Sequence, residues 1–244
     1  MIRKAMILAA GKGTRLGEIT KERPKALVDI GGTTPLEFTV RRLAAAGFRE
    51  LMVNVHHFAE MVADAAAKIG AKEGVLIEIS DESDELLDTG GGLWKVRDFF
   101  SDAPFLICNV DIIHNVNLDA LYGYHIRKEA LATLVVRHRE GTRYLLTDDK
   151  GVLRGWINRK SGIRFMSVEE EEGCSLSEVA FSGIHAVSPD IFSHMQEGIY
   201  SITGLYLTLA AGGTIYTFMH RNGYWFDIGT PESLSKCRES TPWR

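Results

Sequence analysis

Short apolar runs alternate with amphipathic stretches along the first half of the chain. Continuous apolar runs of about four to eight residues are typical of parallel strands that are buried on both faces. Apolar residues at helical spacing predict helices between these runs. We expect strands at 5–7, 50–55, 74–80, 104–110 and 130–136, and helices at 35–48, 59–69, 89–99 and 118–128. This alternation predicts βαβ units and a mostly parallel sheet.

The pattern changes after residue 143. Two short strands, 144–147 and 152–157, flank Asp148-Asp149-Lys150-Gly151, and this arrangement predicts a hairpin. The rest of the chain predicts strands at 162–168, 179–187, 214–219 and 224–226, and helices at 189–195, 201–211 and 231–237. Because no proline-rich or serine-rich linker interrupts it, the sequence predicts a single α/β domain over 1–244. A small β-rich lobe is expected at about 138–180.

Composition narrows the class of protein. The 244 residues are 45% hydrophobic and 25% charged, which is ordinary for a soluble globular protein. The formal net charge of −4 predicts no general affinity for nucleic acid or an acidic membrane. The three cysteines form no C-x-x-C motif, and no secretory signal or membrane span is apparent. We therefore expect reduced thiols in a cytoplasmic protein.

A glycine-rich, positively charged loop follows the first apolar run. Gly11 and Gly13 lack a Cβ and tolerate positive φ, so successive backbone amides can point at one anion. Lys12, Arg15 and Lys25 bring positive charge to the same segment. The spacing does not match a Walker A loop, and the third glycine of a dinucleotide fingerprint is a leucine here. The loop therefore predicts a polyphosphate site of another kind.

Two aspartates stand where apolar strands are expected to end. Asp111 follows 105–110, and Asp227 follows 224–226. In open α/β sheets, ligands bind beyond the carboxyl ends of the strands. Mg²⁺ takes one or two carboxylates together with phosphate and water oxygens. The sequence therefore predicts Asp111 and Asp227 as ligands of Mg²⁺ beside a bound triphosphate.

These segments resemble the signature of the sugar-nucleotide pyrophosphorylases, which are sugar 1-phosphate nucleotidyltransferases. Residues 8–16 and 24–27 match the family's G-x-G-T-R-L and P-K-A-L elements. Asn109-Val110-Asp111 resembles its N-x-D segment, and residues 225–230 resemble its W-x-D-[IV]-G-T segment. Residues 88–92 are similar to its T-G-G segment, and residues 181–184 to the strand that faces the sugar. The resemblance covers nearly the whole chain.

The resemblance implies a GT-A-like fold, in which a Rossmann-like, mostly parallel sheet has helices on both faces and carries a small β-rich sugar-binding lobe. It also implies Mg²⁺ as cofactor and catalytic roles for Arg15 and Lys25. The nucleotide contacts it implies are Leu8, Ala9, Ala10, Gly11, Lys12, Gly13, Thr14, Arg15, Lys25, Thr89, Gly90, Gly91 and Asn109. The implied substrate contacts are Asn158, Ser182, Gly183 and Asp227, and the implied metal ligands are Asp111 and Asp227.

The identity of the substrates is less well determined by the sequence. Within the family, the chain is most similar to N-acetylmuramate 1-phosphate uridylyltransferases and to short mannose 1-phosphate guanylyltransferase-like proteins. We expect UTP as donor and an amino-sugar 1-phosphate, such as N-acetylmuramate 1-phosphate, as acceptor. The alternatives are a GTP-dependent mannose or heptose 1-phosphate guanylyltransferase, a phosphocholine cytidylyltransferase, and a non-catalytic nucleotide-binding regulatory homologue. The sequence leaves both a monomer and a homodimer open.

Overall fold

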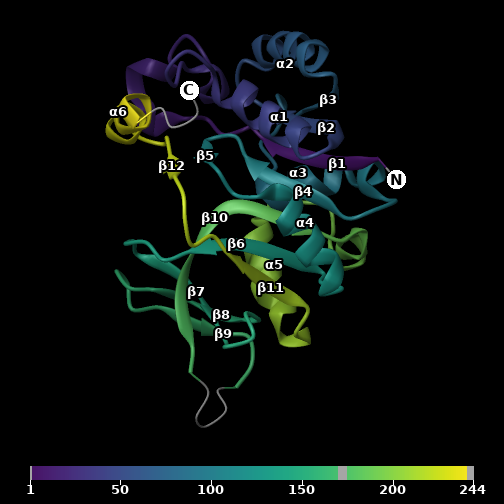
Figure 1. The fold of residues 1–244 in the computed structure, drawn as a ribbon, viewed down its shortest axis with the longest axis vertical. Helices are drawn as coiled ribbons and strands as arrows, with labels where there is room; N and C mark the ends of the chain where they lie inside the picture. Colours follow the sequence, from purple (N-terminus) through teal and green to yellow (C-terminus); the bar gives the residue numbers. More distant parts are fainter. Residues whose placement is uncertain (1, 170–174, 241–244) are drawn as a thin grey trace. The chain divides into compact units, whose positions relative to one another are not determined.

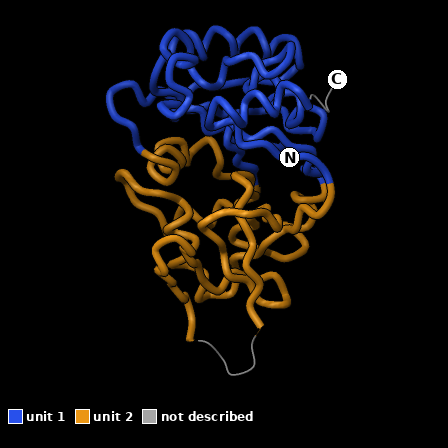
Figure 2. The backbone as a smooth tube through the Cα atoms, turned by 90° about the vertical axis from the view of Figure 1, so that its left-hand side faces the viewer, with its two compact units in different colours: residues 1–87, 105–119, 223–244 blue, residues 88–104, 120–222 orange. Residues whose placement is uncertain are grey.

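The computed structural model describes residues 2–169 and 175–240, and the chain forms two compact units (Figure 2). Unit 1 comprises residues 1–87, 105–119 and 223–244. Unit 2 comprises residues 88–104 and 120–222. The chain therefore passes between the two units repeatedly, and each unit is assembled from segments that are distant in sequence.

Unit 1 is built on a parallel sheet, as the sequence predicts. Its strands are β1 (Arg3–Leu8), β2 (Phe48–Val55), β3 (Leu76–Asp81) and β4 (Phe105–Asn109), in the order β3-β2-β1-β4 (Figure 1). The order reverses between β1 and β4, because β2 and β3 lie on one side of β1 and β4 lies on the other. Ligands of such sheets bind beyond the carboxyl ends of the strands at this switch point. Leu8 pairs with Asn109 there, so the segments that follow these residues emerge side by side.

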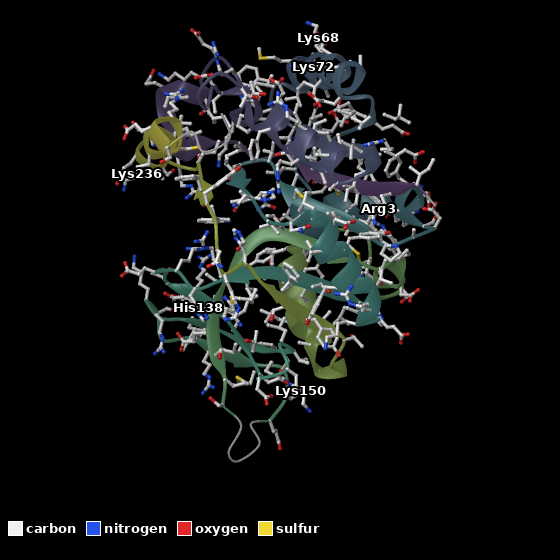
Figure 3. All side chains as sticks on the ribbon, viewed as in Figure 1. Arg3, Lys68, Lys72, His138, Lys150 and Lys236 are labelled. Atoms are coloured by element: carbon white, nitrogen blue, oxygen red, sulfur yellow. The ribbon has the colours of Figure 1, made fainter. Side chains whose placement is uncertain are left out.

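Two helices of unit 1, α1 (Pro35–Ala45) and α2 (Ala59–Glu73), pack against each other. The Thr34 side chain caps α1 by accepting a hydrogen bond of 3.2 Å from the Glu37 amide, and Pro35 suits the first turn. Gly47, at φ 84°, follows the helix in the left-handed conformation that ends many helices. Lys72 on α2, labelled in Figure 3, pairs with Glu37 on α1 at 2.7 Å.

A small hydrophobic core stabilises the segments of unit 1 that lie beyond the carboxyl ends of the parallel strands. Antiparallel strands β5 (Ile112–His114) and β12 (Trp225–Asp227) meet here, next to α6 (Pro231–Ser240) and the 3₁₀ turns η1 (Thr14–Thr20) and η2 (Lys25–Leu27). β5 was not expected from the sequence, because three residues are too few to show an alternating pattern. The buried core residues are Leu16, Val28, Ile30, Phe38, Ile113, Ile228, Leu234 and Cys237.

Unit 2 contains a mostly antiparallel set of strands in the order β11-β6-β10-β7-β8-β9. They are β6 (Ala132–Arg137), β7 (Arg143–Thr147), β8 (Leu153–Asn158), β9 (Arg164–Met166), β10 (Ser177–Val187) and β11 (Ile215–Met219). Among the strands of unit 2 in the described part of the chain, β6 and β11 form the only parallel pair. The expected hairpin is confirmed, because β7 and β8 pair antiparallel across Asp148-Asp149-Lys150-Gly151.

The helices of unit 2 are shorter than the sequence predicts. α3 (Asp88–Lys95) stops before the 3₁₀ turn η3 (Arg97–Phe100), although a helix was expected to continue to residue 99. The other helical elements are α4 (Leu118–Arg127), η4 (Pro189–His194), α5 (Ile202–Leu209) and η5 (Ala210–Gly212). No helix within 2–169 and 175–240 is long and apolar enough to cross a membrane. Cys108 and Cys237 are buried free thiols, and Cys174 lies outside the described residues.

Two buried histidines of unit 2 make its stability depend on pH. Burial lowers the pKa of His185 to about 3 and that of His125 to about 4, against 6.5 for an ordinary histidine. The unfolded chain therefore binds protons between pH 6.5 and pH 3–4 that the folded chain does not. The contribution of these histidines to the free energy of unfolding is greatest above pH 6.5. It falls as the pH drops, by about 2 kcal/mol for each histidine at pH 5.

We expect His185→Asn to remove about half of this pH dependence, because asparagine cannot titrate and can still bond to the Tyr206 hydroxyl, 2.7 Å from Nδ1 in the native protein. The measurement is urea unfolding at pH 7 and pH 5. The control is His57→Asn at an exposed position, which should leave the difference unchanged. Equal pH dependence of native protein and His185→Asn would contradict this account.

Candidate active site

The glycine loop begins where β1 ends, at Leu8. Gly13 has φ 64°, a conformation that favours glycine, and its carbonyl accepts bonds from the Leu16 amide at 2.9 Å and the Thr20 hydroxyl at 3.1 Å. Within the described residues, the backbone amides of 10–13 donate no hydrogen bond. Neighbouring amides that lack a partner in an exposed loop can together bind an anion. This geometry suits the nucleotide-binding role expected for residues 8–14.

The start of the loop is held by two residues that sequence reasoning missed. The Ala9 amide donates to Asn54 Oδ1 at 2.8 Å, and Asn54 Nδ2 donates to Glu82 Oε1 at 2.8 Å. Asn54 and Glu82 are 3% and 2% exposed, so these contacts satisfy polar groups that would otherwise be buried without partners. The available signal was Asn54 itself, a polar residue within the apolar run Leu51–Val55.

Arg15 lies beside Asp227 in unit 1. Their neighbours Leu16 and Ile228 are buried in the small core, while Arg15 is exposed and Asp227 half-buried. A Cβ at Gly229 would stand 2.5 Å from Arg15 Nη2 and 2.7 Å from Asp227 Oδ1. The absence of a side chain at Gly229 therefore leaves room for both groups. Within the described part of the chain, Arg15 and Lys12 form no ion pair, so both remain available to an anionic ligand.

The two aspartates come from adjacent strand ends. Asp227 pairs with Ile112 in the β5–β12 ladder, and the Ile228 amide donates to the Asp111 carbonyl at 3.0 Å. The Lys25 ammonium forms an ion pair with the Asp111 carboxylate, and these side chains are only 10% and 23% exposed. The structure thus brings Lys25, Asp111, Asp227 and Arg15 to one region of unit 1, as the sequence predicts for a site at the sheet edge.

The chemistry of this group fits a divalent metal ion. Carboxylate oxygens are the hard donors that Mg²⁺ prefers, and the Asp111 carboxylate already holds a cation, the Lys25 ammonium. Among the residues that the structure describes, no three His, Cys, Asp or Glu side chains gather as a metal cluster. A metal bound by the two aspartates would therefore take its other ligands from phosphate and water. The assignment of both aspartates as ligands stays a prediction.

The T-G-G segment lies in unit 2 at the start of α3. The Thr89 hydroxyl accepts a bond from the Ile202 amide at 3.0 Å, and the Gly90 amide donates to the Tyr200 carbonyl at 2.8 Å. A Cβ at Gly90 would stand 2.4 Å from the Tyr200 ring, so glycine is needed for this close packing. Thr89 and Gly90 thus have a structural role at the start of α5. Their contact with nucleotide, and that of Gly91, stays a prediction.

The expected sugar contacts are also in unit 2. Asn158 Oδ1 accepts from the Lys160 amide at 3.0 Å and so stabilises the turn after β8. Ser182 is fully buried, and Gly183 has φ 74° at an irregularity of β10. The neighbouring Phe181 lines a cavity of about 440 Å³, which sequence reasoning missed together with Arg139 and Arg143 on its wall.

Comparison with known proteins identifies the family. A family model described as nucleotidyl transferase matches residues 4–242. The chain belongs to this family. The expected family and enzyme class are therefore confirmed, and the parallel sheet of unit 1 is the one expected for a Rossmann-like nucleotidyltransferase.

Two relatives differ in the nucleotide for which they are named. An N-acetylmuramate alpha-1-phosphate uridylyltransferase of Caulobacter vibrioides is 28% identical over 236 residues, which cover 94% of this chain and 93% of the relative. A mannose-1-phosphate guanyltransferase of Yarrowia lipolytica is 29% identical over 235 residues. That match covers 95% of this chain but only 62% of the longer relative.

A solved structure has the same fold. The chain is similar to a UDP-glucose pyrophosphorylase complexed with UDP-glucose, with a TM-score of 0.75 and 17% identity over 98% of each chain. At this identity the likeness supports the fold class and not a particular substrate.

Proposed function

We propose that this protein transfers a nucleoside monophosphate from a nucleoside triphosphate to a sugar 1-phosphate, and that UTP and an amino-sugar 1-phosphate such as N-acetylmuramate 1-phosphate are its substrates. The observation that carries the proposal is the meeting in unit 1 of the unpaired loop amides, Arg15, Lys25 and two aspartates. Anion-binding and cation-binding groups side by side are what a metal-bound triphosphate requires.

The reaction needs charge neutralisation more than it needs a base. A sugar phosphate has a second pKa of about 6, so at neutral pH its oxygen is already an anionic nucleophile. This oxygen attacks the α-phosphorus, the bond to the β-phosphate breaks, and pyrophosphate leaves. The loop amides and Arg15 would hold the β- and γ-phosphates and stabilise the departing charge, and Lys25 would bind the α-phosphate and the incoming phosphate.

Asp111 and Asp227 would hold the metal ion, which we propose to be Mg²⁺. When bound, the ion would reduce the repulsion between the triphosphate and the acceptor phosphate. Lys25 would then exchange its contact with Asp111 for contacts with phosphate oxygens, because the metal competes for the same carboxylate. Lys25 would therefore contact the phosphate oxygens only when the metal ion and the nucleotide are both bound.

The test of the proposed function is a pyrophosphate-release screen of four nucleoside triphosphates against a panel of sugar 1-phosphates and phosphocholine. We expect turnover with at least one sugar 1-phosphate. Nucleotide binding without any turnover would favour the regulatory homologue, and turnover of phosphocholine alone would favour the cytidylyltransferase. Either result would overturn the proposal.

We expect UTP to be used in preference to GTP, because relatives that match almost end to end are named uridylyltransferases. A base that leaves buried polar groups unpaired loses about 1–3 kcal/mol for each group, or roughly tenfold or more in kcat/KM. The measurement is competition of all four triphosphates for one pool of sugar phosphate, with the products separated by chromatography. A product mainly in the GDP-sugar form would overturn this choice and favour the guanylyltransferase.

A further inference from the structure

The Asn54 side chain lies at the point where β1 ends and the glycine loop begins. Leu8 and Asn54 form the last pair of the parallel β1–β2 ladder. The next amide of the chain, that of Ala9, donates to Asn54 Oδ1 at 2.8 Å. A side chain of the neighbouring strand therefore sets the direction in which the chain leaves β1 and enters the loop.

The Glu82 carboxylate, which holds Asn54, is itself fixed by four hydrogen bonds to its residue. The Glu82 amide donates to the Val55 carbonyl at 2.7 Å. Its carbonyl lies 2.6 Å from His56 Nδ1, which must donate because a carbonyl oxygen can only accept. One carboxylate oxygen accepts from Asn54 Nδ2 at 2.8 Å, and the other accepts from the Leu87 amide at 3.2 Å. Glu82 therefore has little freedom to move, and it fixes which way the Asn54 amide group faces.

Stability alone does not explain why this polar pair is buried. The exposed fractions of Asn54 and Glu82 are 3% and 2%. Removing an amide and a carboxylate from water costs free energy, which their hydrogen bonds largely offset without adding much to stability. Apolar side chains of similar volume would fill the same space at no such cost. What the pair supplies is a hydrogen-bond acceptor at a defined point, directed at the Ala9 amide.

The amides that follow Ala9 are the ones proposed above to bind phosphate, because those of 10–13 donate no hydrogen bond within the described residues. We propose that Asn54 and Glu82 are positioning residues for the nucleotide: Glu82 orients Asn54, and Asn54 holds Ala9, so that the loop amides are aligned before the nucleotide binds. This inference rests on the proposed function and adds to it two residues that act through the loop. A loop that is aligned for only a tenth of the time binds its ligand about tenfold more weakly.

The first test removes the link at nearly constant side-chain volume. In Asn54→Leu, the Ala9 amide and the Glu82 carboxylate lose their common partner. We expect KM for the nucleoside triphosphate to rise about tenfold or more, while KM for the sugar 1-phosphate stays near its native value. A merely structural role would lower the fraction of active protein, and hence the apparent kcat, without raising one KM alone. Asn54→Ala should give the same result and replaces Asn54→Leu if that variant does not fold.

The second test restores the link with one hydrogen bond reversed. In the double variant Asn54→Asp/Glu82→Gln, the new amide at position 82 can donate to the new carboxylate at position 54 and still accept from the Leu87 amide. The other carboxylate oxygen can accept from the Ala9 amide. All three hydrogen bonds are kept and the net charge is unchanged, so we expect KM for the nucleotide to return close to the native value.

Ser80→Ala is the matched control for both tests. Ser80 pairs with Asn54 in the β2–β3 ladder and is 5% exposed. Within the described residues, its hydroxyl has no hydrogen-bond partner. Ser80→Ala therefore removes a buried polar group from the same place without breaking the link to the loop, and both KM values should remain native.

Calorimetric titration of UTP and GTP with Mg²⁺, in the absence of acceptor, separates this inference from the proposed reaction. Weaker binding by Asn54→Leu that the double variant restores would support the positioning role even if no sugar phosphate is turned over. Native nucleotide affinity in a folded Asn54→Leu or Asn54→Ala, or a double variant as impaired as Asn54→Leu, would overturn the positioning role and leave the proposed function standing. A native protein that binds neither nucleotide would overturn both.

Discussion

Removal of divalent cations with EDTA is expected to abolish nucleotide transfer, and added Mg²⁺ is expected to restore it. Asp111 and Asp227 stand at paired strand ends beside Arg15 and Lys25, so the site places two carboxylates where a triphosphate would add more negative charge. Without a metal ion, these groups would repel the nucleotide. The measurement is pyrophosphate release in buffer treated with chelator, followed by titration with Mg²⁺.

Amide variants assign this requirement to particular carboxylates. Asp111→Asn and Asp227→Asn should each lower kcat by roughly 10² or more and weaken Mn²⁺ binding measured by electron paramagnetic resonance. Asp149→Asn, at an exposed hairpin turn, is the control and should change neither quantity. Full activity in metal-free buffer, or native Mn²⁺ binding in both site variants, would end the two-aspartate hypothesis.

The sequence predicts β1, β2 and β4 well, because buried parallel strands are continuous apolar runs. It also predicts β3, although this strand lies at the sheet edge and most of its residues are not buried. It also places the glycine loop and Asp111 at one sheet edge, since both follow such runs. It cannot reveal contacts between distant residues. Lys25 and Asp111 are separated by 86 positions in the sequence, and only the folded chain shows that their side chains form an ion pair. The same holds for Asn54 and Glu82, whose importance depends on their burial beside Ala9.

The sequence predicts side-chain positions least well where they depend on the pairing register of neighbouring strands. The hairpin of β7 and β8 is evident from Asp148-Asp149-Lys150-Gly151, but a shift of one residue would move Arg143 and Trp156 to the other face. The cavity therefore could not be derived from the sequence. Asn158 was expected to contact substrate. Its Oδ1 accepts a hydrogen bond from the Lys160 amide in the turn after β8, and the contact with substrate stays a prediction.

Lys25→Met is expected to lower kcat by roughly 10² or more while the protein remains folded. Methionine keeps most of the length of the side chain, which is only 10% exposed, but removes the charge that would stabilise the transition state. Lys21→Met is the matched control, because Lys21 lies in the same segment, is 66% exposed and pairs with Glu18 on the surface. Near-native kcat in a folded Lys25→Met would remove Lys25 from the mechanism.

The same variant should bind metal more tightly in the absence of nucleotide. In the native protein the ammonium of Lys25 competes with a divalent cation for the Asp111 carboxylate. Removing this competing cation from a largely buried carboxylate should strengthen Mn²⁺ binding several-fold or more. A variant that loses catalysis yet gains metal affinity is difficult to explain by general damage to the fold. If Lys25→Met instead lost both, Lys25 would be needed to hold the site together, and its proposed exchange between aspartate and phosphate would be wrong.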